Sequence, residues 1–589
     1  MRNSKLLLFI FFNLIVTIIN AQRFEKCPSW VQDLVVYELS PKTYTSPQGP
    51  GTGTFNSLKE KIPYLRDLGI NAVWMSGHSW SDNQHFYNIW TQYACIRPDS
   101  IDASLGTSED LKKLVTEFHN NGIKVFLDII THGVMNYSPL ISEKPHWFKG
   151  GSWGMTDYDW YGGHADLDEW WVNTHVKYVL EYGIDGFRLD VEMPRPDLWQ
   201  RIKDEVARKG HPIAICLENP HLYTNNVPDF YQTSNRIMPI TCSNIKDFNI
   251  RGSLLHDVAT YYQNYIYNRN NNKITKVDVY YADNTKDSWT DTGDGNLTLK
   301  TDLLSQKKLK LKINGINKCK QIKRIEISSS LYNNKYVLTA NDSPGNFQLA
   351  LTDLSEINLI LDYFPADRIY LSNELSSHDR GWEGFDLYKN PYLVQRSRCI
   401  LGYSSLLTPS IPIFMAGEEF NAQFVPLPWL SPYLFKKENI GKGRWLYGSW
   451  LQWDQLNQLE NQDFLMDVKK ILSIRTQERD VIHSFYSDLV PNILALEYKA
   501  DAELPVPYII WNEKKAVIII GNNTDNDVEV QIKIPFKKIG MESLDSVRIS
   551  DLWNGGCWTI KTEETTYFSC IVKKDKISGG GLAIYKLEK

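Results

Sequence analysis

"SLKEKIPYLRDLGINAVWMS" (57–76) joins a helix-like segment to a strand-like segment through a single glycine. Apolar side chains recur at helical spacing between Leu58 and Leu68, and the pattern stops at Gly69. The apolar run 70–76 that follows predicts a buried strand. A helix and a strand of this kind need further strands to pack against, so the neighbouring segments decide the fold.

The same alternation continues on both sides of this stretch. Further strands are expected at 34–39, 123–130, 184–191 and 211–219, and further helices at 107–122 and 170–183. Strands that alternate with helices predict βα units and a parallel sheet, and continuous apolar strands fit burial on both faces. A doubly wound sheet and a (β/α)8 barrel both satisfy this pattern. No glycine-rich phosphate loop follows the first strand, which disfavours a nucleotide-binding fold.

The alternation is interrupted by stretches that read as strands alone. Short alternating segments separated by Asn, Asp, Gly and Ser predict an inserted all-β module at 268–365. Helix and strand signals resume at 366–483, and the chain becomes β-rich again at 484–589. We therefore expect a catalytic domain in two parts, 22–267 and 366–483, and a C-terminal β-sandwich domain.

The first 21 residues have the parts of a secretory signal. Arg2 and Lys5 precede an apolar run at 6–19, and Ile19-Asn20-Ala21 suits signal peptidase. An uncleaved membrane anchor is the alternative, but the run is short for a span and contains Asn13. We expect cleavage, a secreted or periplasmic protein, and no membrane association afterwards.

Composition and charge indicate which kinds of ligand or partner the protein is suited to bind. The net charge is −5 with a pI near 6.2, which gives no reason to expect nucleic acid or an anionic membrane. The 19 Trp and 32 Tyr suit a protein that stacks on sugar rings, although a large core uses the same residues. None of the 8 cysteines forms a CxxC pair, so no structural zinc site is expected. Cys557 and Cys570 flank a predicted hairpin and could form a disulfide.

Acidic residues recur at the carboxyl ends of the predicted strands. These are Asp128, Asp190, Glu218 and Asp379. A single acid at such a place is usually a helix cap or an ion-pair partner. Several acids at equivalent strand ends indicate chemistry, because the active sites of (β/α)8 barrels are built at that rim.

The types of residue suit glycoside hydrolysis. One carboxylate attacks the anomeric carbon or activates water, and one carboxylic acid with a raised pKa protonates the leaving oxygen. Arg188, two residues before Asp190, would keep that carboxylate ionised and fix its rotamer.

Over most of 34–482 the sequence resembles the α-amylase superfamily, glycoside hydrolase family 13. The resemblance is carried by "GFRLD" (186–190), "ICLENP" (215–220), "LSSHDR" (375–380) and "TPSIPIFMAGEEF" (408–420), in the family's order. It implies a (β/α)8 barrel fold, with Asp190 as the nucleophile, Glu218 as the acid/base and Asp379 as the third acid. It also implies substrate contacts for Arg188, for His378, and for Tyr87 as a residue that stacks on the sugar.

Two departures concern the third strand and the metal. The family has Asp-x-x-x-Asn-His there, whereas "DIITHG" (128–133) has His132 and Gly133 at the last two positions. The resemblance makes calcium the cofactor to consider, but its usual ligand pattern is altered, so no metal ligand is assigned. His132 could contact the sugar instead, or could be an ordinary loop histidine.

The expected function is a retaining hydrolase of α-glucosidic bonds in starch or maltooligosaccharides. A transglycosylase on α-glucans would use the same residues. A non-catalytic glycan-binding protein on this fold is the alternative from another class. The aromatic stretch 146–163 could supply sugar platforms or local packing, and the 268–365 module could bind carbohydrate or be structural. Oligomeric state is not indicated.

Overall fold

The computed structural model describes most of the chain from residue 27 to residue 588. The described ranges are 27–82, 93–152, 154–218, 227–232, 274–290, 297–301, 309–314, 322–329, 336–339, 347–353, 356–361, 370–374, 378, 398–407, 410–422, 424–426, 449–487, 490–502, 504–505, 507–522, 524–562 and 567–588. The predicted signal segment 1–21 lies outside them.

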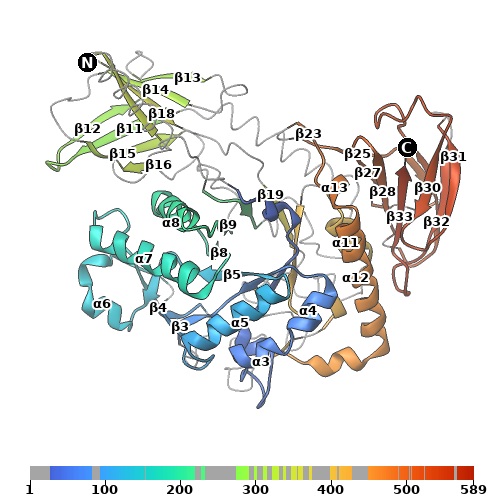
Figure 1. The fold of residues 1–589 in the computed structure, drawn as a ribbon, viewed down its shortest axis with the longest axis horizontal. Coiled ribbons are helices and arrows are strands. Elements are labelled where there is room, and N and C mark those ends of the chain that lie inside the picture. Colours follow the sequence, from blue (N-terminus) through green and yellow to red (C-terminus); the bar gives the residue numbers. More distant parts are fainter. Residues whose placement is uncertain are drawn as a thin grey trace, which may run out of the picture.

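A closed barrel of parallel strands forms the centre of the molecule (Figure 1). Its strands, in order around the ring, are β1 (Val36–Leu39), β2 (Ala72–Met75), β5 (Lys124–Ile129), β8 (Gly186–Leu189), β9 (Ala214–Leu217), β10 (Phe230–Tyr231), β19 (Tyr370–Glu374) and β20 (Ser410–Met415). The last strand pairs with the first and closes the ring. The predicted (β/α)8 barrel is thus confirmed, and the doubly wound alternative is excluded.

Helices follow the strands and cover the outside of the barrel (Figure 1). They include α3 (Phe55–Lys59), α4 (Ile62–Leu68), α5 (Ser108–Asn120), α7 (Ala165–Tyr182), α8 (Pro196–Arg208), α11 (Arg398–Ser405), α12 (Leu459–Gln477) and α13 (Arg479–Ile482). α5 begins with a reciprocal capping box between Thr107 and Asp110. α7 ends at Gly183, which has φ 82° and so adopts the left-handed conformation that stops a helix.

The single helix predicted within 57–69 is two helices in the structure. α3 ends at Lys59, and α4 begins at Ile62 with Pro63 in its first turn. Proline has no N–H to continue the preceding helix and fits the first turn of a new one, so the chain breaks and restarts here. The helix predicted at 170–183 begins earlier, at Ala165.

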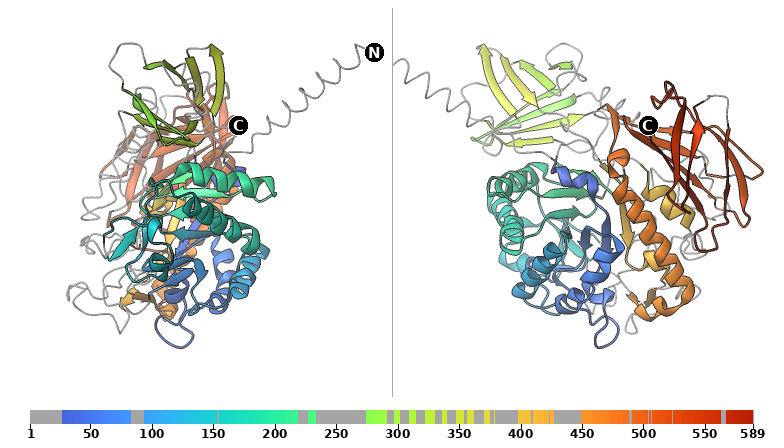
Figure 2. Two further views of the ribbon diagram at one scale, coloured as in Figure 1. Left: turned by 90° about the vertical axis from the view of Figure 1, so that its left-hand side faces the viewer. Right: turned by 45° about the vertical axis from the view of Figure 1, so that its right-hand side comes forward.

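Strands of the insert form two four-stranded antiparallel sheets. One contains β11 (Ile274–Tyr281), β12 (Lys286–Thr290), β15 (Ile322–Ser329) and β16 (Tyr336–Thr339), and the other contains β13 (Leu297–Thr301), β14 (Leu309–Asn314), β17 (Phe347–Asp353) and β18 (Glu356–Leu361). The module lies beside α8, which contacts β16 (Figures 1 and 2).

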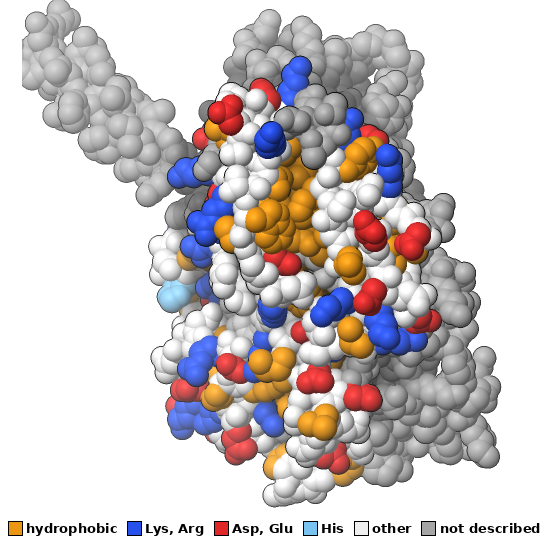
Figure 3. All heavy atoms as spheres, turned by 90° about the vertical axis from the view of Figure 1, so that its right-hand side faces the viewer, with side chains coloured by type: hydrophobic (Ala, Val, Ile, Leu, Met, Phe, Trp, Pro, Cys, Tyr) orange, Lys and Arg blue, Asp and Glu red, His pale blue; other side chains and the backbone are white. Residues whose placement is uncertain are grey.

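The C-terminal region contains a six-stranded and a three-stranded sheet. The first comprises β25 (Ile493–Ala495), β27 (Tyr508–Trp511), β28 (Lys515–Gly521), β33 (Leu582–Glu588), β30 (Ser546–Asp551) and β31 (Cys557–Lys561). The second comprises β26 (Tyr498–Ala500), β29 (Val528–Lys533) and β32 (Tyr567–Val572). Figure 3, which views the molecule from this end, shows charges of both signs interspersed on the surface and a larger hydrophobic patch among them.

This region packs on α11 and α12 through a continuous core. The large hydrophobic cluster of the barrel extends into β27, β28 and β33. Arg398 of α11 is buried in the contact, where it pairs with Asp467 of α12 and donates from Nη1 to Asp575 O at 3.1 Å. A Cβ at Gly402 would lie 2.1 Å from a Leu582 methyl group, so a larger residue there would force the Leu582 side chain to shift.

The disulfide considered between Cys557 and Cys570 is not formed, and both thiols are free. The two cysteines lie on β31 and β32, which belong to different sheets, so they do not face each other across a hairpin. In the described ranges, no helix has the combined length and apolar character that crossing a bilayer requires.

Candidate active site

Arg188 of β8 is the centre of a polar cluster at the carboxyl ends of the barrel strands. Its side chain is 1% exposed. Nη1 lies 3.1 Å from Asp128 Oδ1 and 2.5 Å from Asp190 Oδ1. Nε donates to Gln232 Oε1 at 3.0 Å. Nη2 lies 3.0 Å from Glu218 Oε2, an ion pair without hydrogen-bond geometry. One guanidinium thus contacts acids from three neighbouring strands.

The strand register explains this gathering. Asp128 in β5 pairs with Arg188 in β8, so their side chains share the barrel interior. Asp190 and Glu218 each follow their strand by one residue, which places them at the rim. Exposure follows the same order: the side chains of Asp190 and Glu218 are 13% and 27% exposed, whereas that of Asp128 is 2% exposed. The two rim acids are therefore the ones that a substrate could reach.

Asp128 serves as the buried support of the cluster. Its Oδ2 accepts from Trp74 Nε1 at 2.8 Å, from Ser76 Oγ at 3.0 Å and from the Tyr93 hydroxyl. Burial raises the pKa of Tyr93 well above its usual value, so its hydroxyl stays protonated and donates. The Trp74 indole also lies under the guanidinium, 4.7 Å from its carbon.

The imidazole of His378 is positioned by a buried acid on β1. Its Nδ1 hydrogen-bonds Glu38 Oε1 of β1, and its ring stacks on Tyr93 with centroids 5.3 Å apart. Burial raises the pKa of Glu38 well above its usual value. The pair fixes the imidazole on the wall of the site, next to the cluster around Arg188.

A strained turn connects the two rim acids. Glu192 N donates to Asp190 O at 2.6 Å, which closes a three-residue turn around Val191 with φ 60°. Positive φ is costly for a β-branched residue, and this turn form is rare. The central N–H of Val191 donates to Glu218 Oε2 at 2.5 Å.

Thr131, which follows the end of β5 by two residues, holds this turn in place. Its side chain is completely buried, and Oγ1 lies 3.0 Å from Asp190 O and 2.8 Å from Glu192 O. The single hydroxyl proton is therefore shared between the carbonyl oxygens at the two ends of the strained segment. The direction of the Val191 N–H, and with it the position of the Glu218 carboxylate, depends on Thr131.

The expectation of a raised pKa for Glu218 is wrong for the free protein. Burial raises the pKa of Glu218, but the Arg188 guanidinium and the Val191 N–H outweigh burial and leave it lowered. Sequence reasoning missed the Val191 N–H, because backbone direction in a three-residue turn is not encoded in a motif. Glu218 is thus ionised in the free protein at neutral pH.

His132 and Gly133 occupy the altered end of the third strand. His132 Nδ1 lies 3.7 Å from Asp157 Oδ1, and its side chain is 18% exposed. Gly133 begins β6 (Gly133–Met135), which pairs with β7 (Met155–Asp157). A Cβ at Gly133 would lie 2.1 Å from Thr156 O, so no larger residue fits there. The β6–β7 pair therefore excludes the family's usual histidine.

The residues near this strand end do not fit a calcium ion. Calcium prefers carboxylate and carbonyl oxygens. Here the carboxylates already have side-chain partners: Asp157 lies near His132, Asp159 near His164 at 3.2 Å, Asp166 near His146 at 3.0 Å, and Asp168 pairs with Arg195 at 2.7 Å. Within the described ranges, no group of three or more His, Cys, Asp or Glu is arranged to hold a metal.

The aromatic stretch considered as a set of sugar platforms mainly packs. Trp147, Tyr158 and Trp160 are buried and contact one another, Trp170 or Trp171. Tyr161 differs, because it is 51% exposed. The interpretation as platforms is wrong for the three buried rings, since sugar cannot reach them.

Two predicted site residues, Tyr87 and Asp379, lie outside the described residues. The structure brings together Asp190, Glu218, Arg188 and His378, and places His132 nearby at the end of β5. It places Asp128, one of the strand-end acids expected from sequence, in the same cluster, and it adds Glu38, Tyr93 and Gln232, to which no role in the site was assigned from sequence. Glu38 had a detectable signal, a charged residue inside an apolar strand. Tyr93 and Gln232 had none.

Comparison with known proteins adds to this arrangement. The family model "Alpha amylase, catalytic domain" matches residues 38–166, which include Glu38 and Asp128. Over this segment the chain is similar to the catalytic domain of α-amylases. The matched segment ends before the two rim acids.

Curated relatives within the superfamily match over part of their length. Trehalose-6-phosphate hydrolase of Bacillus subtilis is 29% identical over 208 residues, covering 28% of this chain and 36% of the relative. An α-glucosidase of Culex pipiens is 27% identical over 242 residues, covering 34% and 40%. The chain therefore matches little more than a third of the length of these relatives.

Solved superfamily structures match over nearly the whole chain. A maltogenic α-amylase of Thermotoga neapolitana has a TM-score of 0.58 at 13% identity and covers 95% of this chain and 99% of its own. An α-amylase of Geobacillus thermoleovorans has a TM-score of 0.56 at 14% identity, covering 95% and 99%. These likenesses support the barrel fold.

Proposed function

We propose that the protein is a secreted, retaining glycoside hydrolase that cleaves α-glucosidic bonds in starch or maltooligosaccharides. The single observation that carries this proposal is the contact of one buried guanidinium, Arg188, with both Asp190 and Glu218. Two carboxyl groups on the same small cation lie close together, as attack by one of them on the sugar requires. The names of the curated relatives supply the α-glucosidic class.

In the first step the Asp190 carboxylate attacks the anomeric carbon. The glycosidic bond breaks as Glu218 gives its proton to the leaving oxygen. In the second step Glu218 removes a proton from water, and the water oxygen displaces Asp190 from the sugar. By resemblance, Asp379 binds ring hydroxyls. Arg188 pairs with Asp190 before the attack and again after the sugar has left.

Glu218 must gain a proton before the first step. It is ionised in the free protein, held by Arg188 and by the Val191 N–H. A sugar oxygen bound at Oε2 would compete with the Val191 N–H, and exclusion of water would raise the pKa. We therefore expect kcat/KM to decline as pH rises from the acidic range, because it depends on protonated Glu218 in the free enzyme.

Product analysis tests the proposal. The full chain would be incubated with starch, pullulan, maltooligosaccharides, sucrose and trehalose, and the anomer released first would be read by proton NMR. Retention of the α configuration is expected, and inversion would contradict the assignment of Asp190. Asp190→Asn should abolish turnover. Glu205→Gln, an exchange on the outer helix α8, is the control and should keep it.

Leaving groups separate the acid from the nucleophile. Glu218→Gln should slow maltooligosaccharide cleavage far more than cleavage of an aryl maltoside, whose leaving group needs no proton. Equal losses on both substrates would contradict the acid role. Activity should withstand EDTA, because the carboxylates near β6 and β7 already have histidine or arginine partners.

Transglycosylation is the second candidate, because a 4-α-glucanotransferase of Thermotoga neapolitana is 29% identical over 156 residues. Products longer than the maltooligosaccharide supplied would establish transfer in place of hydrolysis. Secretion is supported by the apolar run 6–19 after Arg2 and Lys5. N-terminal sequencing of the exported protein should begin near Gln22, and a retained Met1 would contradict cleavage.

A further inference from the structure

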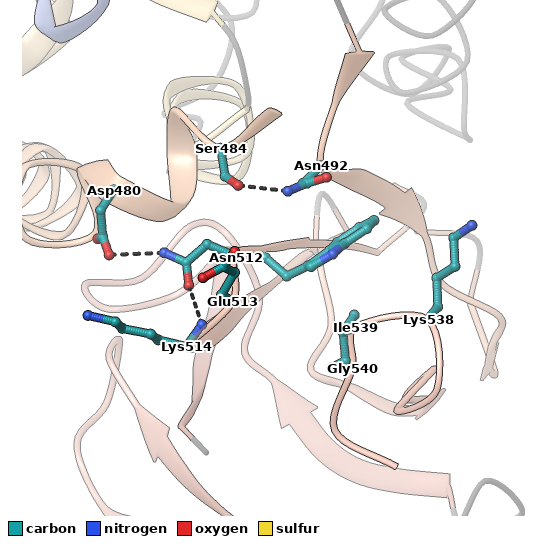
Figure 4. Close-up of a pocket in the computed structure, with 10 residues that line it drawn as sticks. Asp480, Ser484, Asn492, Asn512, Glu513, Lys514, Lys538, Ile539 and Gly540 are labelled. Carbon is teal, nitrogen blue, oxygen red and sulfur yellow. Dashed lines mark hydrogen bonds between the residues drawn. The ribbon is translucent and has the colours of Figure 1, made fainter. Parts of the chain in front are cut away.

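A pocket of about 700 Å³ lies where the end of α13 meets the C-terminal β domain (Figure 4). Its lining comes from three segments: Asp480 and Ser484 at the helix end, Trp511 to Lys514 in the turn between β27 and β28, and the loop 538–540. Asn492 completes the wall. A volume of this size accommodates a ligand of two or three sugar rings.

This pocket is separate from the polar cluster around Arg188. A helix that follows a parallel barrel strand runs back along it, so the end of α12 and α13 lie at the amino ends of the strands. His483, next to α13, pairs at 3.3 Å with Asp33, which precedes β1. The rim acids lie at the carboxyl ends. A sugar bound in this pocket therefore does not present its glycosidic bond to Asp190.

One wall of the pocket carries an unsatisfied acceptor. Asn492 is 9% exposed, its Nδ2 donates to Ser484 Oγ at 2.7 Å, and its Oδ1 has no hydrogen-bond partner among the residues that the structure describes. A buried amide oxygen without a partner is costly. A ligand hydroxyl that enters the pocket could supply the missing donor.

The opposite wall is rigid. Asn512 Nδ2 donates to Asp480 Oδ2 at 3.0 Å, and its Oδ1 accepts from Lys514 N at 2.9 Å and Lys515 N at 3.0 Å. Lys515 Nζ lies 2.9 Å from Asp480 Oδ1. These bonds fix the turn that carries Trp511 before any ligand arrives, which lowers the entropy lost on binding.

The chemistry of the lining selects a neutral polyhydroxylated ligand. The half-buried Trp511 indole offers an apolar ring face, and Asn492 and Ser484 offer hydrogen bonds. Glu513 and Lys538 carry opposite charges, so neither an anionic nor a cationic ligand is favoured. Sugar rings present C–H faces for the indole and hydroxyls that both donate and accept.

We infer that this pocket is a second saccharide-binding site, which holds a distant part of an α-glucan chain while another part is cleaved. The saccharide class follows from the lining, and the α-glucan identity rests on the proposed function. The site would raise activity on long or granular substrates and leave activity on short ones unchanged, because only a long chain can reach both places.

Binding measurements in the full chain test the inference. Glu218→Gln provides an uncleaving background, with maltoheptaose for calorimetry and solubilised starch in native gels. Trp511→Ala in that background should weaken starch retention and pocket binding roughly tenfold or more. Trp558→Ala removes another exposed indole from the same domain and is the matched control. Unchanged retention in Trp511→Ala, or equal losses in both variants, would overturn the inference.

A second variant guards against misfolding. If Trp511→Ala lowers the melting temperature, Asn492→Asp and Lys538→Ala are tested instead in the same assays. Starch retention equal to that of the Glu218→Gln protein would again count against the site. In the active chain, Trp511→Ala should reduce the rate on granular starch several-fold and leave kcat on maltotriose unchanged. Lost starch binding in a protein that cleaves none of the substrates would refute the proposed hydrolase and still support the pocket.

Discussion

At the scale of single residues, Arg188 connects what the sequence motif names to what the site contains. The motif "GFRLD" predicts a pairing of Arg188 with Asp190, and the structure adds Asp128, Gln232 and Glu218 around the same guanidinium. Arg188 is almost completely buried, and acids surround it. Its charge is therefore needed both for the fold and for the proposed chemistry.

Arg188→Gln should destabilise the protein by about 3–5 kcal/mol, because it leaves buried carboxylates without a cation. Turnover should decline by about 10²–10³-fold or more. Urea unfolding and kcat on maltooligosaccharides measure the two effects. Arg201→Gln, which breaks an exposed pair with Glu169, is the control and should change stability by less than about 0.5 kcal/mol. A stable, active Arg188→Gln variant would rule out the central role.

Thr131→Val tests the strained turn at the same scale. The exchange keeps the shape of the side chain and removes the hydroxyl that bonds Asp190 O and Glu192 O. A loss of about 1–3 kcal/mol in unfolding free energy is expected.

The pH profile of Thr131→Val is the decisive readout. A looser turn weakens the Val191 N–H bond to Glu218, so the pKa of Glu218 should rise and the basic limb of kcat/KM should move to higher pH. Thr116→Val removes an exposed hydroxyl that bonds Lys112 O on α5, and it should move neither quantity. A basic limb that stays in place would show that Thr131 does not act through Glu218.

At the scale of elements, α7 is joined to the loop after β2 through two buried histidines. His175 of α7 packs among Trp171, Trp199 and Phe187, and His78 lies against Tyr178. Burial lowers the pKa of His78 to about 3 and that of His175 to about 4. Both are neutral in the folded protein at neutral pH.

These histidines should make stability depend on pH. Their folded pKa values lie below the unfolded value near 6.5, so the unfolded chain binds more protons as pH falls. Stability is fully present above pH 6.5 and should decline by about 2 kcal/mol per histidine between pH 6.5 and 5. His175→Phe should flatten this slope, whereas the exposed control His211→Gln should not. Parallel slopes in all three proteins would contradict the prediction.

Two elements differ from what the local sequence pattern predicts. The helix predicted in 57–69 divides between Lys59 and Ile62, just before Pro63, and buried rings of the aromatic stretch 146–163 pack against α7 instead of facing solvent. Periodicity identified the apolar residues of 57–69, and composition singled out the aromatic stretch. It could not say which neighbour would cover them, because that depends on the element that follows in space.

At the scale of the whole molecule, the barrel and the C-terminal domain share one core. The buried pair of Arg398 and Asp467 lies between them, and Gly579 N donates to Asp467 Oδ2 at 2.9 Å. Tyr508 of β27 also donates its hydroxyl to Tyr403 O of α11 at 2.7 Å. The two parts should therefore unfold together.

Asp467→Asn should destabilise the barrel and the C-terminal domain in one step. The exchange leaves Arg398 buried without its anionic partner, which costs about 3–5 kcal/mol. Calorimetry should show these two parts melting in one transition at a lower temperature. Asp463→Asn, on the exposed side of α12, is the control and should melt like the parent. A variant that melts in two separate transitions would show that the shared core does not couple the domains.

The sequence by itself determined the alternation of strands and helices, the β-rich segments and, by resemblance, the acids expected at the rim of a barrel. Strand and helix periodicity are local, and motifs such as "GFRLD" and "ICLENP" fix residue type and spacing along the chain. The tertiary structure alone decided that Glu38, Tyr93 and Gln232 join the cluster and that Val191 directs its N–H at Glu218. It also decided that β7 approaches Gly133 too closely for a larger residue. These contacts join distant segments or depend on backbone direction, so neither composition nor spacing contains them.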